Sequence, residues 1–147
     1  MEDRNSVEVE WLILADAAQV VGNKLYLMGG GWDVLTVNSA FPVQQHCALA
    51  ASFRVPWSET NRPHSVEIEI QDDDGGRLMQ ATAQVEIGRP PGMAPQPQRV
   101  QIAADMLLEF KRPGTYVVIA RVEGQSSERV PFRVVPGPMV QGQPAAG

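Results

Sequence analysis

The chain has 147 residues, of which 44% are hydrophobic and 20% charged, and its formal net charge is −5. This length suits one domain with a core that needs no disulfide or metal staples, and the composition excludes global disorder. An acidic chain without a run of Lys and Arg is a poor partner for nucleic acid or an anionic membrane, so neither partner is expected.

Cysteine use and the first residues predict the compartment. Cys47 is the single cysteine, so an internal disulfide is ruled out and nothing indicates an oxidising environment. The opening residues MEDRNSVEVE are acidic and lack the apolar core of a signal peptide. We therefore expect a cytoplasmic protein whose residues 1–6 form a flexible N-terminus.

The first predicted strand is apolar on both faces. One face carries alternate apolar residues from Val7 to Ala15, while Leu12 and Leu14 lie on the other. A strand of this kind is expected to be covered on both sides, by a loop or by another chain. Gly22-Asn23 then predicts a turn, and Lys24–Met28 the returning strand.

Three consecutive glycines, Gly29–Gly31, interrupt this returning strand before Trp32–Val37 resumes a β-rich pattern. They predict a bulge, a sharp corner or a close approach of the backbone. A phosphate cradle is not expected, because no Lys or Ser/Thr follows at P-loop spacing and no helix is predicted after the glycines.

The middle of the chain alternates clearly between apolar and polar residues. Strands are predicted from Cys47 to Val55, from Val66 to Gln71 and from Met79 to Ile87. Pro56 ends the first of them, the polar loop Trp57–His64 follows, and Asp72–Gly76 forms a hairpin turn.

The last third begins with Gly88–Gln98, which is rich in proline and predicts an irregular loop. Val100–Phe110 is predicted as a strand, although Ala103–Glu109 alone could also form a short helix, and this alternative stays open. Two closing strands follow the turn at Pro113-Gly114, and residues 136–147 are predicted to be a disordered C-terminal tail.

About eight or nine strands at roughly ten-residue spacing predict an all-β antiparallel sandwich over residues 7–135. The sequence Pro113-Gly114-Thr115-Tyr116, entering a penultimate strand, resembles the tyrosine corner of immunoglobulin-like sandwiches. We therefore expect an immunoglobulin-like domain.

Residues that could bind a metal ion are few and poorly arranged. His46 and Cys47 are adjacent on a strand, so their side chains point to opposite faces and cannot share one ion. Asp72, Asp73 and Asp74 form the densest oxygen cluster, but Ca²⁺ needs about six to eight oxygens and a hairpin turn favours these residues by itself. We predict no metal and no cofactor, with Cys47 as an inert buried thiol.

Catalysis is not indicated either. The chain has two histidines and no nucleophile-elbow motif, so we predict that it is not an enzyme. The loop after Pro56 is the best candidate for recognition, because it concentrates an aromatic ring, both charge signs, an amide and an imidazole. The hypothetical binding residues are Trp57, Glu59, Asn61, Arg62 and His64.

Three stretches carry a resemblance to a known family: LADAAQVVGNKLYLMGGGW, VPWSETNRPH and the ending PGTYVVIARVEG with VPFRV. Together they resemble an uncharacterised family of small bacterial proteins, a domain of unknown function with an immunoglobulin-like look, which implies no activity. The leading hypothesis is a non-catalytic interaction or scaffold module that contacts a partner protein or self-associates. The alternative is a sandwich whose end loops bind a small molecule or Ca²⁺.

Overall fold

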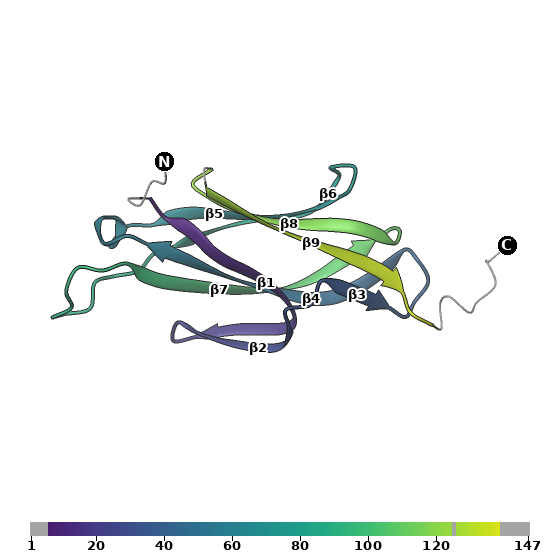
Figure 1. Ribbon diagram of the computed structural model, residues 1–147, viewed down its shortest axis with the longest axis horizontal. Coiled ribbons are helices and arrows are strands. Elements are labelled where there is room, and N and C mark those ends of the chain that lie inside the picture. Colours follow the sequence, from purple (N-terminus) through teal and green to yellow (C-terminus); the bar gives the residue numbers. More distant parts are fainter. Residues whose placement is uncertain (1–5, 125, 139–147) are drawn as a thin grey trace.

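The computed structural model describes residues 6–124 and 126–138, which form two stacked β-sheets (Figure 1). Within these residues there are nine strands and one 3₁₀ turn: β1 (Glu8–Val21), β2 (Lys24–Gly30), β3 (Val34–Val37), β4 (Val43–Val55), η1 (Trp57–Glu59), β5 (His64–Asp72), β6 (Arg77–Val85), β7 (Gln98–Phe110), β8 (Gly114–Val122) and β9 (Ser126–Pro136). The all-β prediction is confirmed, and Ala103–Glu109 belongs to a strand rather than a helix.

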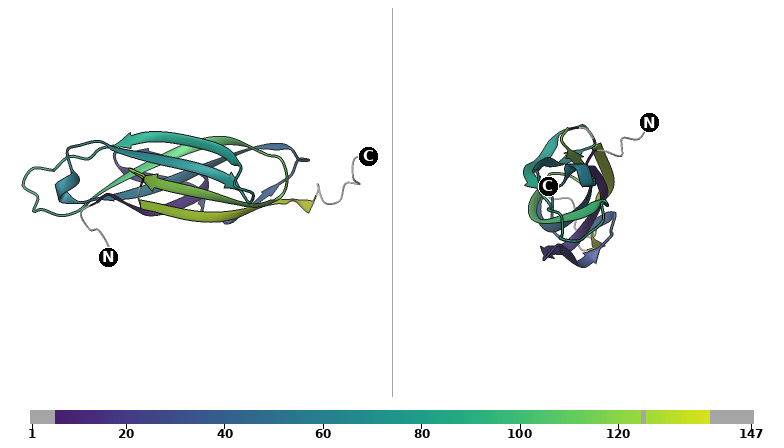
Figure 2. Two further views of the ribbon diagram at one scale, coloured as in Figure 1. Left: turned by 90° about the horizontal axis from the view of Figure 1, so that it is seen from above. Right: turned by 90° about the vertical axis from the view of Figure 1, so that its left-hand side faces the viewer.

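Two sheets make up the described part of the chain. We name sheet A the one with the order β2-β1-β4-β7, and sheet B the one with the order β3-β9-β8-β5-β6. Neighbouring strands are antiparallel except β3 and β9, which run parallel. The two views in Figure 2 show the sheets stacked along the length of an elongated molecule. The sandwich prediction is therefore confirmed, while immunoglobulin-like connectivity stays a prediction.

The core lies between the sheets, where alternate residues of each strand point inward. Leu49 and Phe53 of β4 and Val118 of β8 have no exposed surface. At one end the rings of Phe110, Tyr116 and Phe132 pack together, with centroids 5.0 Å apart for the first two and 5.7 Å for the last two. Aromatic contacts of this kind add stability beyond the area that they bury.

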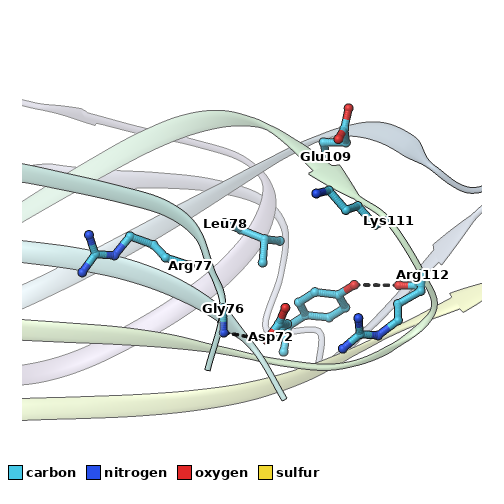
Figure 3. Close-up of a pocket in the computed structure, with 8 residues that line it drawn as sticks. Asp72, Gly76, Arg77, Leu78, Glu109, Lys111 and Arg112 are labelled. Carbon is cyan, nitrogen blue, oxygen red and sulfur yellow. Dashed lines mark hydrogen bonds between the residues drawn. The ribbon is translucent and has the colours of Figure 1, made fainter. Parts of the chain in front are cut away.

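Tyr116 fixes the turn between β7 and β8. Its ring is buried, and its hydroxyl donates a 2.6 Å hydrogen bond to the carbonyl oxygen of Arg112 (Figure 3). This is the contact that the tyrosine-corner prediction requires, so the predicted local geometry is confirmed. Burial raises the pKa of the Tyr116 hydroxyl above its ordinary value, although the nearby charge of Arg112 opposes this shift.

Replacing Tyr116 by Phe should lower the free energy of unfolding by about 0.5–1.5 kcal/mol, because one net hydrogen bond is lost while the ring packing remains. Urea denaturation at pH 7 measures this difference. Since the folded-state pKa of Tyr116 is raised, the wild-type chain should also lose stability as the pH rises above about 10, and Tyr116→Phe should lose less. Equal denaturation midpoints at pH 7 would contradict the proposed role of the hydroxyl.

The β1–β2 hairpin leaves the sandwich and forms a third layer. β1 pairs with β4 only from Glu8 to Ala15, and beyond that point it pairs only with β2. Asn23, at the tip, hydrogen-bonds to the backbone of β7, which is on the other side of β4. The hairpin therefore crosses the outer face of sheet A, and Figure 1 shows it below β7.

The part of β4 that lies beneath the hairpin carries small residues. Ala48, Ala50 and Ser52 alternate with the core residues of β4 and so point to the outer face of sheet A, yet they have no exposed surface. The expectation that the first strand is covered on both faces is confirmed in this sense: Leu12 and Leu14 pack in the core, and the strand's own hairpin folds across the other face of the sheet.

Side chains pack directly against two of the three consecutive glycines where β2 returns from the hairpin. Gly29 has φ +59°, and a Cβ atom there would lie 2.2 Å from Oδ2 of Asp16. A Cβ atom on Gly30 would lie 2.2 Å from Cδ2 of Leu27, and the Gly31 N–H donates to the Leu14 carbonyl oxygen. The predicted close approach of the backbone is thus present.

The predicted terminal segments fall mostly on residues that are not described. Of the flexible N-terminus, residues 1–6, only Ser6 is described, and of the disordered tail, residues 136–147, only Pro136–Pro138. Pro136 is the last residue of β9, so the sandwich extends one residue beyond the predicted boundary at 135.

Cys47 is buried in the core, with 1% of its surface exposed, and burial raises the pKa of its thiol to about 11. The thiolate, which is the reactive form, is therefore rare at pH 8. We expect a thiol reagent to modify Cys47 only after unfolding, with labelling followed by mass spectrometry with and without denaturant. Rapid modification of the native chain would contradict this facing of β4.

Candidate functional site

The predicted recognition loop is held by a second loop, residues 86–97. The Arg89 guanidinium lies 4.7 Å from the ring centroid of Trp57, donates to the Trp57 carbonyl oxygen at 2.8 Å and donates to the Thr60 hydroxyl at 2.6 Å. The N–H of Asn61 donates to the Ile87 carbonyl oxygen at 2.8 Å. These contacts join the two loops at one end of the sandwich.

His64 anchors the same loop from inside. It is 1% exposed, its Nδ1 lies 2.5 Å from Oε1 of Glu123, and its Nε2 lies 2.7 Å from the Glu59 carbonyl oxygen. The Glu123 carboxylate and the Glu59 carbonyl oxygen thus hold the His64 ring from two sides. His64 therefore acts as a structural clamp between η1 and the β8–β9 turn.

The five predicted binding residues thus divide into three that are at least half-buried and two that are exposed. Trp57 is half-buried beneath Arg89, and His64 is buried. Glu59 is half-buried and forms a 3.0 Å ion pair with Arg62, whereas Asn61 and Arg62 themselves are exposed. A partner could reach Asn61 and Arg62 directly, and the binding role of this loop stays a prediction.

Arg89→Ala should lower the free energy of unfolding by about 1–2 kcal/mol, because it removes a cation–π contact and charge-assisted hydrogen bonds. Arg62→Ala, the matched control, removes a guanidinium from an exposed ion pair and should change it by less than about 0.5 kcal/mol. Chemical denaturation of both variants measures the difference. Equal losses would contradict the view that Arg89 joins the two loops.

The acidic turn between β5 and β6 is partly neutralised by an arginine that sequence analysis did not connect with it. Oδ1 of Asp72 accepts hydrogen bonds from the N–H groups of Asp74 and Gly76, which closes the turn. The Arg112 guanidinium contacts Asp73 at 2.9 Å and Asp74 at 2.8 Å, and these bonds raise the pKa of Arg112. The cluster therefore has a cation supplied by the chain itself.

A surface cleft of about 330 Å³ lies beside this turn (Figure 3). Its lining residues come from strands β5 to β8 and from the β5–β6 and β7–β8 turns: Asp72, Gly76, Arg77, Leu78, Glu109, Lys111, Arg112 and Tyr116. Arg77 is paired with Glu69, and Arg112 with Asp73 and Asp74. The small-molecule alternative would act here, but two of the three cations that could recognise an anion already have partners.

Charged side chains cover the outer face of sheet B. Glu69 is buried between Arg77, at 2.6 Å, and Arg121, at 3.1 Å, and Arg121 also contacts Glu67 at 2.7 Å. The hydrogen bond from Arg77 lowers the pKa of Glu69, against the opposing effect of its burial. This face is a satisfied ion-pair network rather than an apolar surface.

The β1–β2 hairpin is different, because it exposes apolar side chains. Of the seven large hydrophobic residues that are exposed in the described ranges, four belong to it: Val21 at 53%, Tyr26 at 56%, Leu27 at 36% and Met28 at 73%. We call Val21, Tyr26 and Met28 the hairpin surface, because the β1–β2 register places them on one face of the hairpin, whereas Leu27 points to the other face. Interfaces between proteins are enriched in Tyr and Met, and monomers rarely expose large continuous apolar patches.

A hollow of about 440 Å³ adjoins the hairpin surface and extends it to β7. Tyr26 and Met28 line it together with Ala17, Gln19 and Asp105. Leu107, which is 66% exposed, lies two residues after Asp105 and so points to the same face of β7. The hairpin surface therefore continues onto the outer face of sheet A.

Sequence analysis missed this surface, although a signal was available. Between Asp16 and Asp33 the only charged residue is Lys24, in a chain where one residue in five is charged. An apolar hairpin could equally have packed all of its side chains against the core. The sequence alone therefore could not show that Tyr26 and Met28 are exposed, and the structure was needed to place the hairpin.

Comparison with known proteins gives a family whose function is unknown. Residues 10–135 match the model described as a family of unknown function, DUF6941. A search of curated protein sequences gives no match. No helix in residues 6–124 and 126–138 is long and apolar enough to cross a membrane.

Solved structures resemble the chain only distantly. A β-glucosidase from Listeria innocua in complex with gluconolactone has a TM-score of 0.48 and 7% identity over 88% of this chain and 16% of that chain. The Pseudomonas fluorescens alkylpurine DNA glycosylase AlkC, bound to DNA containing an abasic site analog, has a TM-score of 0.47 and 12% identity over 88% of this chain and 30% of that chain. The chain thus spans less than a third of the length of either protein.

Proposed function

The chain belongs to DUF6941, a family of unknown function, and we propose that it is a non-catalytic interaction module that binds a partner protein through the β1–β2 hairpin. The observation that carries this proposal is the exposure of Val21, Tyr26 and Met28 on one face of this hairpin. The proposal places the module in the cytoplasm, as its cysteine content suggests.

The free edge of β2 supports the proposal. Gly22 and Asn23 have φ values of 59° and 58°, which suit a two-residue type I′ turn, and the residues that flank such a turn pair by hydrogen bonds. The backbone groups of Lys24, Tyr26 and Met28 then point toward β1, and those of Leu25 and Leu27 point away from it. A strand of the partner can add to this edge while its side chains contact the hairpin surface.

The hairpin surface is the better candidate than the loop that holds Trp57 and His64. In the loop, the Trp57 ring and the His64 imidazole already contact other residues of the chain, whereas Tyr26 and Met28 of the hairpin are exposed. Apolar and aromatic side chains at the centre of an interface contribute most of the binding free energy, and exposed charges at its rim contribute little.

The double variant Tyr26→Ser with Met28→Lys should abolish partner capture, because it removes two apolar contacts and adds a charge to the interface. Tagged full-length protein is incubated with cytoplasm from its source, and captured proteins are quantified by mass spectrometry. Met93→Lys is the control, since Met93 is exposed in a different loop. Both variants should keep the wild-type denaturation midpoint, as exposed substitutions usually do.

A third variant separates the hairpin from the sequence-predicted loop. Glu59→Ala with Arg62→Ala removes the ion pair of that loop and leaves the hairpin intact. The proposal expects this variant to capture the same partner as the wild type. Capture that is lost here and retained by the hairpin variant would transfer the binding role to the loop and overturn the proposal.

A further inference from the structure

β6 is an edge strand of sheet B, and beyond the register shift at its start, opposite Ile70 and Gln71, it has little that would protect its edge. No charged residue and no proline lie between Arg77 and Glu86. Natural edge strands are commonly protected by charges, proline, bulges or a covering segment. The edge of β7 on the same side of the sandwich has such a cover, since the Asn23 side chain pairs with the Arg99 carbonyl oxygen and the Gln101 N–H.

The ladder of sheet B indicates which β6 groups are unpaired. The Glu123 N–H donates to the Ser65 carbonyl oxygen, so odd-numbered residues of β5 point toward β8 and even-numbered residues point toward β6. Val66↔Ala83 and Ile68↔Ala81 are therefore the hydrogen-bonded pairs between β5 and β6. The N–H and C=O groups of the alternate residues, Gln80, Thr82 and Gln84, point away from the sheet.

We propose that two copies of this chain pair β6 with β6, antiparallel, about a two-fold axis at Thr82. The strand reads Met79-Gln-Ala-Thr-Ala-Gln-Val85, which is nearly the same in both directions from Thr82. In this register Thr82 faces Thr82 of the second copy, Gln80 faces Gln84 and Ala81 faces Ala83. The free backbone groups of Gln80, Thr82 and Gln84 then meet in hydrogen-bonded pairs.

The side chains on both faces of β6 fit this register. On the outer face, amides meet amides and hydroxyl meets hydroxyl, which are favourable cross-strand pairs. A two-fold interface requires a self-complementary surface of this kind, and a different partner would not require the repeat in the sequence.

The core is open between β6 and β7, and a second copy paired with β6 would cover apolar surface there. A hollow of about 260 Å³ lies between β6 and β7, with Leu49, Val66 and Ile68 among its apolar lining. Ala81 and Ala83 take core-facing positions opposite Ile68 and Val66, yet they are exposed. Extending sheet B with the second copy's β6 places apolar Met79, Ala81, Ala83 and Val85 of that copy next to this opening.

The two-fold axis through Thr82 provides the test. Thr82→Lys and Thr82→Glu each place like charges opposite one another across the axis, so each variant alone should be monomeric. An equimolar mixture places opposite charges there and should form the dimer again. Light scattering after size-exclusion chromatography measures the mass, which is 16.0 kDa for one copy and twice that for the dimer.

Thr36→Lys is the matched control, because it puts the same charge on β3, the opposite edge strand of sheet B, and should leave the dimer intact. The hairpin variant Tyr26→Ser with Met28→Lys should also remain dimeric, since this pairing is independent of the proposed function. Dimers that survive Thr82→Lys, that fail to re-form in the mixture, or that are lost in the hairpin variant would overturn the proposal. A wild-type chain that is monomeric up to about 1 mM would do the same.

Discussion

Unpaired backbone groups at the edges of the two sheets are the constraint on which much of this structure depends. An open sandwich leaves N–H and C=O groups along its outermost strands, and each sheet must cover, shorten or use them. The chain covers part of the β7 edge with the amide of Asn23, whose two hydrogen bonds reproduce those of a neighbouring strand. That contact requires the β1–β2 hairpin to cross the outer face of sheet A, and the sharp return at Gly29 and Gly30 follows from it.

The edges that remain uncovered are those to which the two proposals apply. β3 is short and lies beside β9 in parallel, whereas β2 and β6 each present several residues with no strand on one side. The edges of β2 and β6 differ in the side chains beside their free backbone groups. These side chains include exposed Tyr26 and Met28 on β2 and uncharged polar residues on β6. A surface rich in apolar groups suits a dissimilar partner, and a symmetric polar strand suits its own copy.

Sequence patterns predicted the elements well, because the alternation of β4, β5 and β8 reflects a local geometric period. The tyrosine corner was also predictable, since Pro113 and Gly114 fix a turn between Tyr116 and its acceptor Arg112, which is four residues earlier. The position of the hairpin was not, because its contacts with β7 join residues 76 to 78 positions apart. The same limit applied to Trp57, whose partner Arg89 comes from a loop with no pattern of its own.

Ala48 and Ala50 have a consequence for how this chain tolerates change. They occupy positions that would face solvent in a two-layer sandwich, where larger polar residues are normally accepted, yet here a strand crosses directly above them. Any side chain longer than a methyl group would push the hairpin away from the sheet and release the Asn23 amide from β7. Both faces of β4 are thus buried. In its packing β4 resembles the central strand of a three-layer protein, although the domain has two sheets.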